Sequence, residues 1–90
     1  MCLNSDQFLV IATGRKIQGS SPGGINFTIT FYASPAAASA AYVRLNPKYA
    51  TLMGAAVIND AGNPPPHPGA PPMRLIHDDL ATLRHCIEPR

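Results

Sequence analysis

The residues best suited to catalysis lie in the C-terminal segment, where imidazoles, carboxylates and a thiol follow one another. His77 precedes Asp78 and Asp79, and His85 precedes Cys86. A cysteine nucleophile requires a base within hydrogen-bond reach and a lowered pKa. His77 and Cys86 would lie at opposite ends of the helix expected here, too far apart to meet. We therefore expect Cys86 to pack as a small apolar residue, and we expect no enzymatic activity from this segment.

The spacing of the other candidate groups does not indicate a metal or cofactor site. Potential metal ligands lack the short paired spacing of a structural zinc site; they are Cys2, His67, His77, His85 and Cys86. The glycines of residues 19–24 match no phosphate-binding pattern and precede a strand rather than a helix. Free thiols are expected for Cys2 and Cys86, because the sequence shows no secretory signal.

The elements that would position these groups are organised around residues 25–45. Apolar residues alternate with polar ones at residues 25–32, which predicts a strand with one buried face and one wet face. The buried set is Ile25, Phe27, Ile29 and Phe31, and the wet set is Asn26, Thr28, Thr30 and Tyr32.

A helix is expected directly after this strand. Ser34 and Pro35 have the chemistry of an N-cap and a first helical position, and Asn46 with Pro47 would end the helix. Its alanine-rich sequence allows a close approach to a sheet. The face expected to pack there contains Ala38, Ala41, Tyr42 and Leu45.

Three further strands and a second helix are predicted. Residues 8–17 are apolar on both faces at their start, which suits a central strand, and residues 18–24 would form a hairpin loop. Residues 49–58 favour a strand over a helix because of Val57 and Ile58, and residues 73–76 would add a short edge strand. Asp78 is the expected N-cap of a helix that ends near Ile87.

Residues 64–72 hold six of the ten prolines and should run as an extended arm. The arm is either a recognition segment for a proline-binding groove or a stiff tether across the domain. We favour the tether here, because a strand and a helix are expected after it.

These elements predict one domain, residues 1–90, of the α+β class. We expect a two-layer sandwich in the order ββαββα, in which a three- to four-stranded, mainly antiparallel sheet carries both helices on one face. The strand of residues 8–17 would lie in the middle, between the strands of residues 25–32 and 49–58.

The uncovered face of such a sheet is the predicted partner-binding surface. A half-polar face with an apolar stripe and a tyrosine has the composition of a contact surface, and outer strands offer backbone for strand addition. The residues expected there are Leu9, Ile11, Asn26, Thr28, Thr30 and Tyr32. The alternative, that a helix or the arm covers the stripe, is equally compatible with the sequence.

Four basic residues suggest a second, less favoured surface for phosphate or an acidic partner. They are Arg15, Lys16, Arg44 and Lys48. The net charge of +2 is small, so we do not favour a dimeric nucleic-acid-binding regulator.

The sequence thus favours a non-enzymatic module that binds a protein partner stoichiometrically, without cofactor or metal. By analogy alone, small domains of this type include inhibitors and adaptors of phages and mobile elements that block host defence complexes, an anti-CRISPR-like role. Homodimerisation through an edge strand is compatible with this role. No membrane span is apparent, and we expect a cytoplasmic protein.

Overall fold

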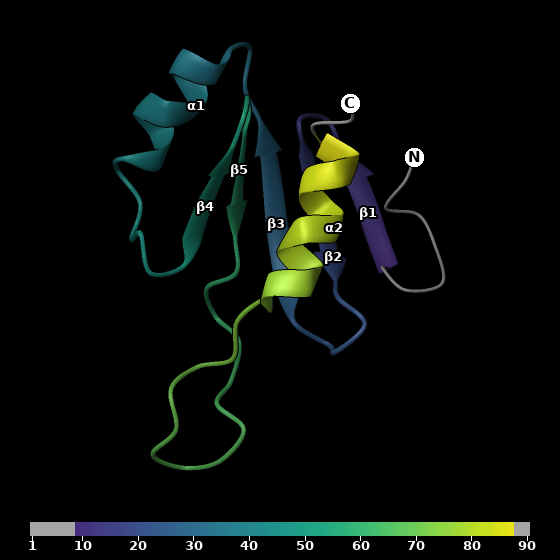
Figure 1. Cartoon of the computed structure of the whole chain (residues 1–90), viewed down its shortest axis with the longest axis vertical. Coiled ribbons are helices and arrows are strands. Elements are labelled where there is room, and N and C mark those ends of the chain that lie inside the picture. The colour runs from purple at the N-terminus through teal and green to yellow at the C-terminus, as the bar shows by residue number, and fades with distance from the viewer. Residues whose placement is uncertain (1–8, 88–90) are drawn as a thin grey trace.

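The described part of the chain folds into one antiparallel sheet and two helices. The computed structural model describes residues 9–87, with side chains described from residue 14 onward. The strands are β1 (Leu9–Thr13), β2 (Lys16–Ser20), β3 (Asn26–Phe31), β4 (Ala50–Met53) and β5 (Ala56–Asn59), and the helices are α1 (Pro35–Tyr42) and α2 (His77–Ile87). The sheet order is β1-β2-β3-β5-β4 (Figure 1). The predicted α+β class and mainly antiparallel sheet are confirmed.

Two segments predicted as single strands are hairpins, which raises the number of strands to five. Thr13 pairs with Lys16, and Met53 pairs with Ala56, so two residues remain in each turn. Gly14 and Gly54 have φ angles of 58° and 56°, whereas no other residue type has a positive φ in the described structure. Glycine at the first central position with a positive φ is typical of a type II′ turn. The strand prediction ran through both glycines and missed these reversals.

The central strand is β3, and the prediction that residues 8–17 lie in the middle of the sheet is wrong. β3 pairs with β2 on one side and with β5 on the other, both antiparallel. β1, formed by part of the predicted central strand, lies at a sheet edge. The predicted hairpin between residues 8–17 and 25–32 is present as the β2–β3 pair. Residues 73–76, predicted as an edge strand, have no regular secondary structure.

α1 begins where the sequence predicts. Ser34 is the N-cap, and its Oγ accepts a hydrogen bond of 3.1 Å from the Ala37 amide, while Pro35 occupies the first turn. The helix ends at Tyr42, three residues before the expected Leu45. From there the amides of Arg44 and Leu45 donate to the carbonyls three residues earlier, so the chain continues in tight turns.

The two helices pack against opposite faces of the sheet, which corrects the prediction that both lie on one face. Ala38 of α1 is fully buried against Ala50 and Val57, and the partly buried neighbours are Tyr32, Tyr42, Leu45 and Leu52. Val57 pairs with Thr30, so both side chains lie on the same face of the sheet. α1 therefore packs on the face that carries the wet residues of β3, and it lies over β4 and β5.

The opposite face carries the main core beneath α2. Leu83 of α2 is fully buried, and Leu80 and Ile87 pack beside it as predicted. The core side chains from the strands are Ile17, Phe27, Ile29, Met53, Ala56 and Ile58. α2 begins at His77, so Asp78, expected as its N-cap, lies inside the first turn.

Neither described helix is long and apolar enough to cross a membrane.

Candidate functional site

α1 packs on one face of the sheet, and it covers only the part of that face formed by β4 and β5. β2 and β3 place six polar side chains on the uncovered part, all exposed or half-buried, which we call the open strip: Lys16, Gln18, Ser20, Asn26, Thr28 and Thr30. These residues form three cross-strand pairs, Lys16 with Thr30, Gln18 with Thr28 and Ser20 with Asn26. The Ser20 hydroxyl donates to Asn26 Oδ1 at 2.7 Å. The strip is therefore a regular array of hydroxyl, amide and ammonium groups.

The strip contains three of the six predicted partner-binding residues. Asn26, Thr28 and Thr30 lie on one face as the alternation predicts. Tyr32 does not join them, because it packs into the cluster beneath α1. Leu9 and Ile11 pair in register with Ser20 and Gln18, next to the strip, and their side chains lie outside the described part. Sequence reasoning missed Gln18 and Ser20, since residues 18–24 were expected to form a loop.

The strip and its border carry positive charge. Lys16 is its only charged member, and the exposed Arg15 precedes it in the β1–β2 turn. The Arg15 carbonyl accepts from the Phe31 amide, so this turn lies at the end of β3 that leads into α1. Arg44 and Lys48 follow the other end of α1. The four predicted basic residues thus form two pairs at opposite ends of the helix.

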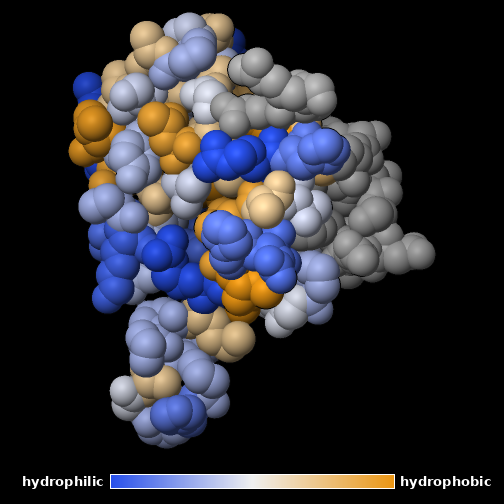
Figure 2. Space-filling view, viewed as in Figure 1, coloured by the Kyte–Doolittle hydropathy of each residue, from blue (hydrophilic) through white to orange (hydrophobic). Residues whose placement is uncertain are grey.

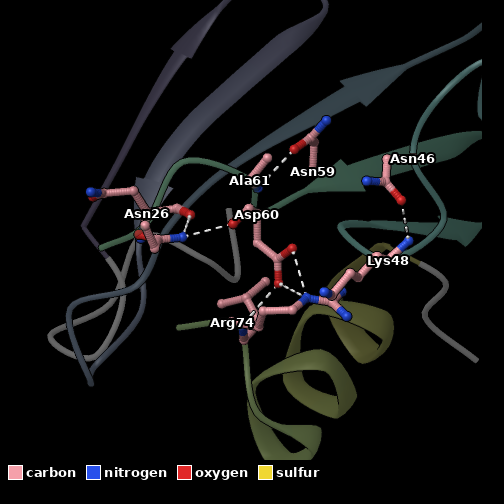
Figure 3. Close-up of polar contacts among 9 residues, drawn as sticks. Asn26, Asn46, Lys48, Asn59, Asp60, Ala61 and Arg74 are labelled. Carbon is pink, nitrogen blue, oxygen red and sulfur yellow. Dashed lines mark hydrogen bonds and ion pairs between the residues drawn. The ribbon is translucent and has the colours of Figure 1, made fainter. Parts of the chain in front are cut away.

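A second polar arrangement, unforeseen from the sequence, joins both ends of the proline-rich segment to the sheet. Asp60, whose side chain is 3% exposed, accepts from the Leu75 amide at 2.9 Å and forms an ion pair with Arg74 at 3.2 Å (Figure 3). Asn63 accepts from the Asn26 amide at 2.8 Å. Its own amide group donates to the carbonyls of Asn26 and Asp60. These bonds fix the chain before and after residues 64–72.

Between these fixed ends, the segment projects from the body as a loop (Figure 1), which we call the arm, residues 64–72. The Ala70 amide donates to the His67 carbonyl, and Gly69 has a φ of 86°. With Pro68 before it, this is the pattern of a type II turn. Because the arm returns to its starting point, the expected tether across the domain is wrong.

The histidines of α2 border a groove instead of a metal site. The groove, of about 540 Å³, lies between α2 and β4. Its lining consists of Thr51, His77, Leu80, Ala81, Arg84 and His85. In the described residues, no three histidine, cysteine or acidic side chains come together as potential metal ligands.

Cys86 is disulfide-bonded, so the expectation of a free thiol is wrong for this residue. It packs against the main core, as expected for a small apolar residue. The other cysteine of the sequence, Cys2, lies outside the described residues. Nucleophilic catalysis needs a thiolate, and a disulfide sulfur does not supply one.

Comparisons with protein-family models, curated proteins and solved structures find no match to this chain.

Proposed function

We propose that this chain is a non-enzymatic module that binds a protein partner stoichiometrically through the open strip. The observation that carries the proposal is the incomplete cover of one sheet face, where α1 spans β4 and β5 and leaves paired polar side chains of β2 and β3 accessible. Hydroxyl and amide groups in fixed register suit a partner that offers matching donors and acceptors.

The charge at one end of the open strip indicates what kind of partner surface it would bind. Lys16 and Arg15 make this end of the strip positive, and in the described structure neither forms an ion pair with an acidic side chain. We therefore propose a partner whose contacting surface is acidic, since complementary charge speeds association and excludes like-charged competitors. The outer strands β1 and β4 offer a second mode, in which backbone pairing joins a partner or a second copy of the chain.

The dimeric nucleic-acid-binding regulator is less well supported. Its four basic residues would have to act as one surface, and they form two pairs at opposite ends of α1. The inhibitor or adaptor role, including the anti-CRISPR-like one, remains an analogy at the level of protein class.

The Cys86 disulfide favours an oxidising compartment over the cytoplasm that the sequence predicts. Disulfides persist in oxidising compartments and are rare in the reducing cytosol.

A matched pair of variants tests the strip. Thr28→Glu places a negative charge on the strip, which would repel an acidic partner, and Thr82→Glu makes the same change on the exposed side of α2. The tagged protein captures partners from host lysate at two salt concentrations, with nuclease added, and the captured protein is then purified. Its affinity should fall at least tenfold with Thr28→Glu and less than twofold with Thr82→Glu.

If the two variants change the affinity equally, the open strip is not part of the interface. Capture that disappears with nuclease, or weakens steeply with salt, would favour the nucleic-acid-binding regulator instead.

A further inference from the structure

The sequence of the arm restricts its first half to an extended conformation. Proline fixes its own φ near −65°. The residue before a proline is excluded from the helical region. Within residues 63–68, these two rules act on every position, because Asn63 and His67 each precede a proline and the other four are prolines. The chain there is confined to polyproline II geometry before any partner arrives.

The base of the arm is fixed by buried polar groups. Asp60 and Asn63 are 3% and 5% exposed, and the Asn63 side chain forms hydrogen bonds with Asn26 of β3 and with Asp60. Burial of a carboxylate is costly unless it is paired and hydrogen-bonded. The Asp60 carboxylate keeps its ion pair and its hydrogen bond only while Arg74 and the Leu75 amide lie beside it. This network therefore holds the two ends of the arm together.

The arm itself contributes little to the core. Residues 64–69 are all exposed, and Figure 2 shows the arm as a lobe separate from the body. Pro65 and Pro68 are three residues apart, which is one turn of a polyproline II helix, or about 9 Å. Two prolines at this spacing present their rings on the same side of the helix.

We propose that residues 64–68 of the arm are a docking segment for a partner protein with an aromatic-lined groove that recognises polyproline II. Preformed proline-rich segments bind such grooves with a small loss of conformational entropy. Lys48 and Arg74 both lie over the Tyr49 ring at the base of the arm, at 5.7 and 5.6 Å from its centroid. This positive base favours a groove with an acidic edge. The arm is separate from the open strip, so the two proposals stand or fall independently.

The experiment uses the full chain and three purified probes that have aromatic proline-binding grooves: an SH3, a WW and an EVH1 domain. Binding is measured by titration of the isotope-labelled protein, with the carbon-bound proton signals of the arm as reporters, because proline has no amide proton. The test variant is Pro65→Ala with Pro68→Ala. The matched control is Pro71→Ala with Pro72→Ala, which removes two prolines beyond the Gly69 turn.

We expect saturable binding to at least one probe, with shifts concentrated in residues 64–68. The Pro65/Pro68 variant should lose affinity at least tenfold, and the Pro71/Pro72 variant less than threefold. Thr28→Glu should leave the affinity unchanged. The inference is overturned if none of the three probes binds, or if the two proline variants lose affinity equally. All substituted prolines are exposed, so the fold should be retained, which an unchanged amide spectrum outside the arm would verify.

Discussion

The two faces of the sheet pack against their helices through side chains of different size. The face beneath α2 is filled with large aliphatic and aromatic side chains that meet a fully buried leucine, Leu83. On the other face α1 contributes mainly Ala38, which meets Ala50 and Val57. Small side chains bring a helix close to a sheet but cover little of its width. One face therefore supplies most of the buried apolar area, and the other retains room for a polar surface.

The sharpest test of this contrast is Leu83→Ala. The substitution removes a fully buried side chain from the main core and leaves a cavity, so we expect a loss of about 2–5 kcal/mol in the free energy of unfolding. Chemical denaturation measures it. Thr82→Ala, at the exposed neighbouring position, should change stability by less than about 0.5 kcal/mol. A small effect of Leu83→Ala would mean that α2 does not close the core.

On the opposite face, the informative change adds volume instead of removing it. Ala38→Leu should force α1 away from Ala50 and Val57 and destabilise the protein by about 1–3 kcal/mol. The matched control is Ala40→Leu in the same helix, where the side chain is exposed. If both variants melt at the temperature of the unchanged protein, α1 is not packed closely on β4 and β5.

The smallest effect is expected on the open strip. Gln18→Ala removes an exposed side chain that forms no hydrogen bond with the described residues, so its effect on stability should stay within about 0.5 kcal/mol. Thermal unfolding measures this change. A loss above about 1.5 kcal/mol would show that Gln18 supports the fold, and the strip would then be a structural feature and not a surface kept free for binding.

Local signals were enough to predict some elements. The start of α1 depends on Ser34 and Pro35, and the buried face of β3 depends on strict alternation, so both follow from neighbouring residues. The core face of α2 is likewise readable from the spacing of Leu80, Leu83 and Ile87. Each of these features depends on residues that lie only a few positions apart in the sequence.

The hairpins were missed although their signal is short-range. Gly14 and Gly54 each follow an apolar run and precede one further turn residue, and glycine at the first central position is typical of a two-residue type II′ hairpin. Residues 8–17 and 49–58 were each predicted as one strand that runs through its glycine. Without these reversals, β1 could not be placed at an edge, and β3 could not be recognised as the centre.

The placement of the helices and the arm required contacts that spacing does not encode. β5 is buried on both faces, with Val57 towards α1 and Ile58 in the main core, so its sequence does not say that helices lie on opposite sides. The bond between Asn63 and Asn26 joins residues 37 positions apart. Asn59, Asp60 and Asn63 are residue types common in turns, and nothing in the sequence marks Asp60 and Asn63 as buried.

The closed base of the arm also affects how the sequence can change over time. Since Asp60, Asn63 and Arg74 hold the ends, residues between them can be exchanged or added without disturbing the sheet. Doubling the length of such a loop costs only about 0.6 kcal/mol in closure entropy. The arm can therefore accumulate substitutions and insertions faster than the body that carries it, and a lineage can acquire new specificity there while it keeps the same fold.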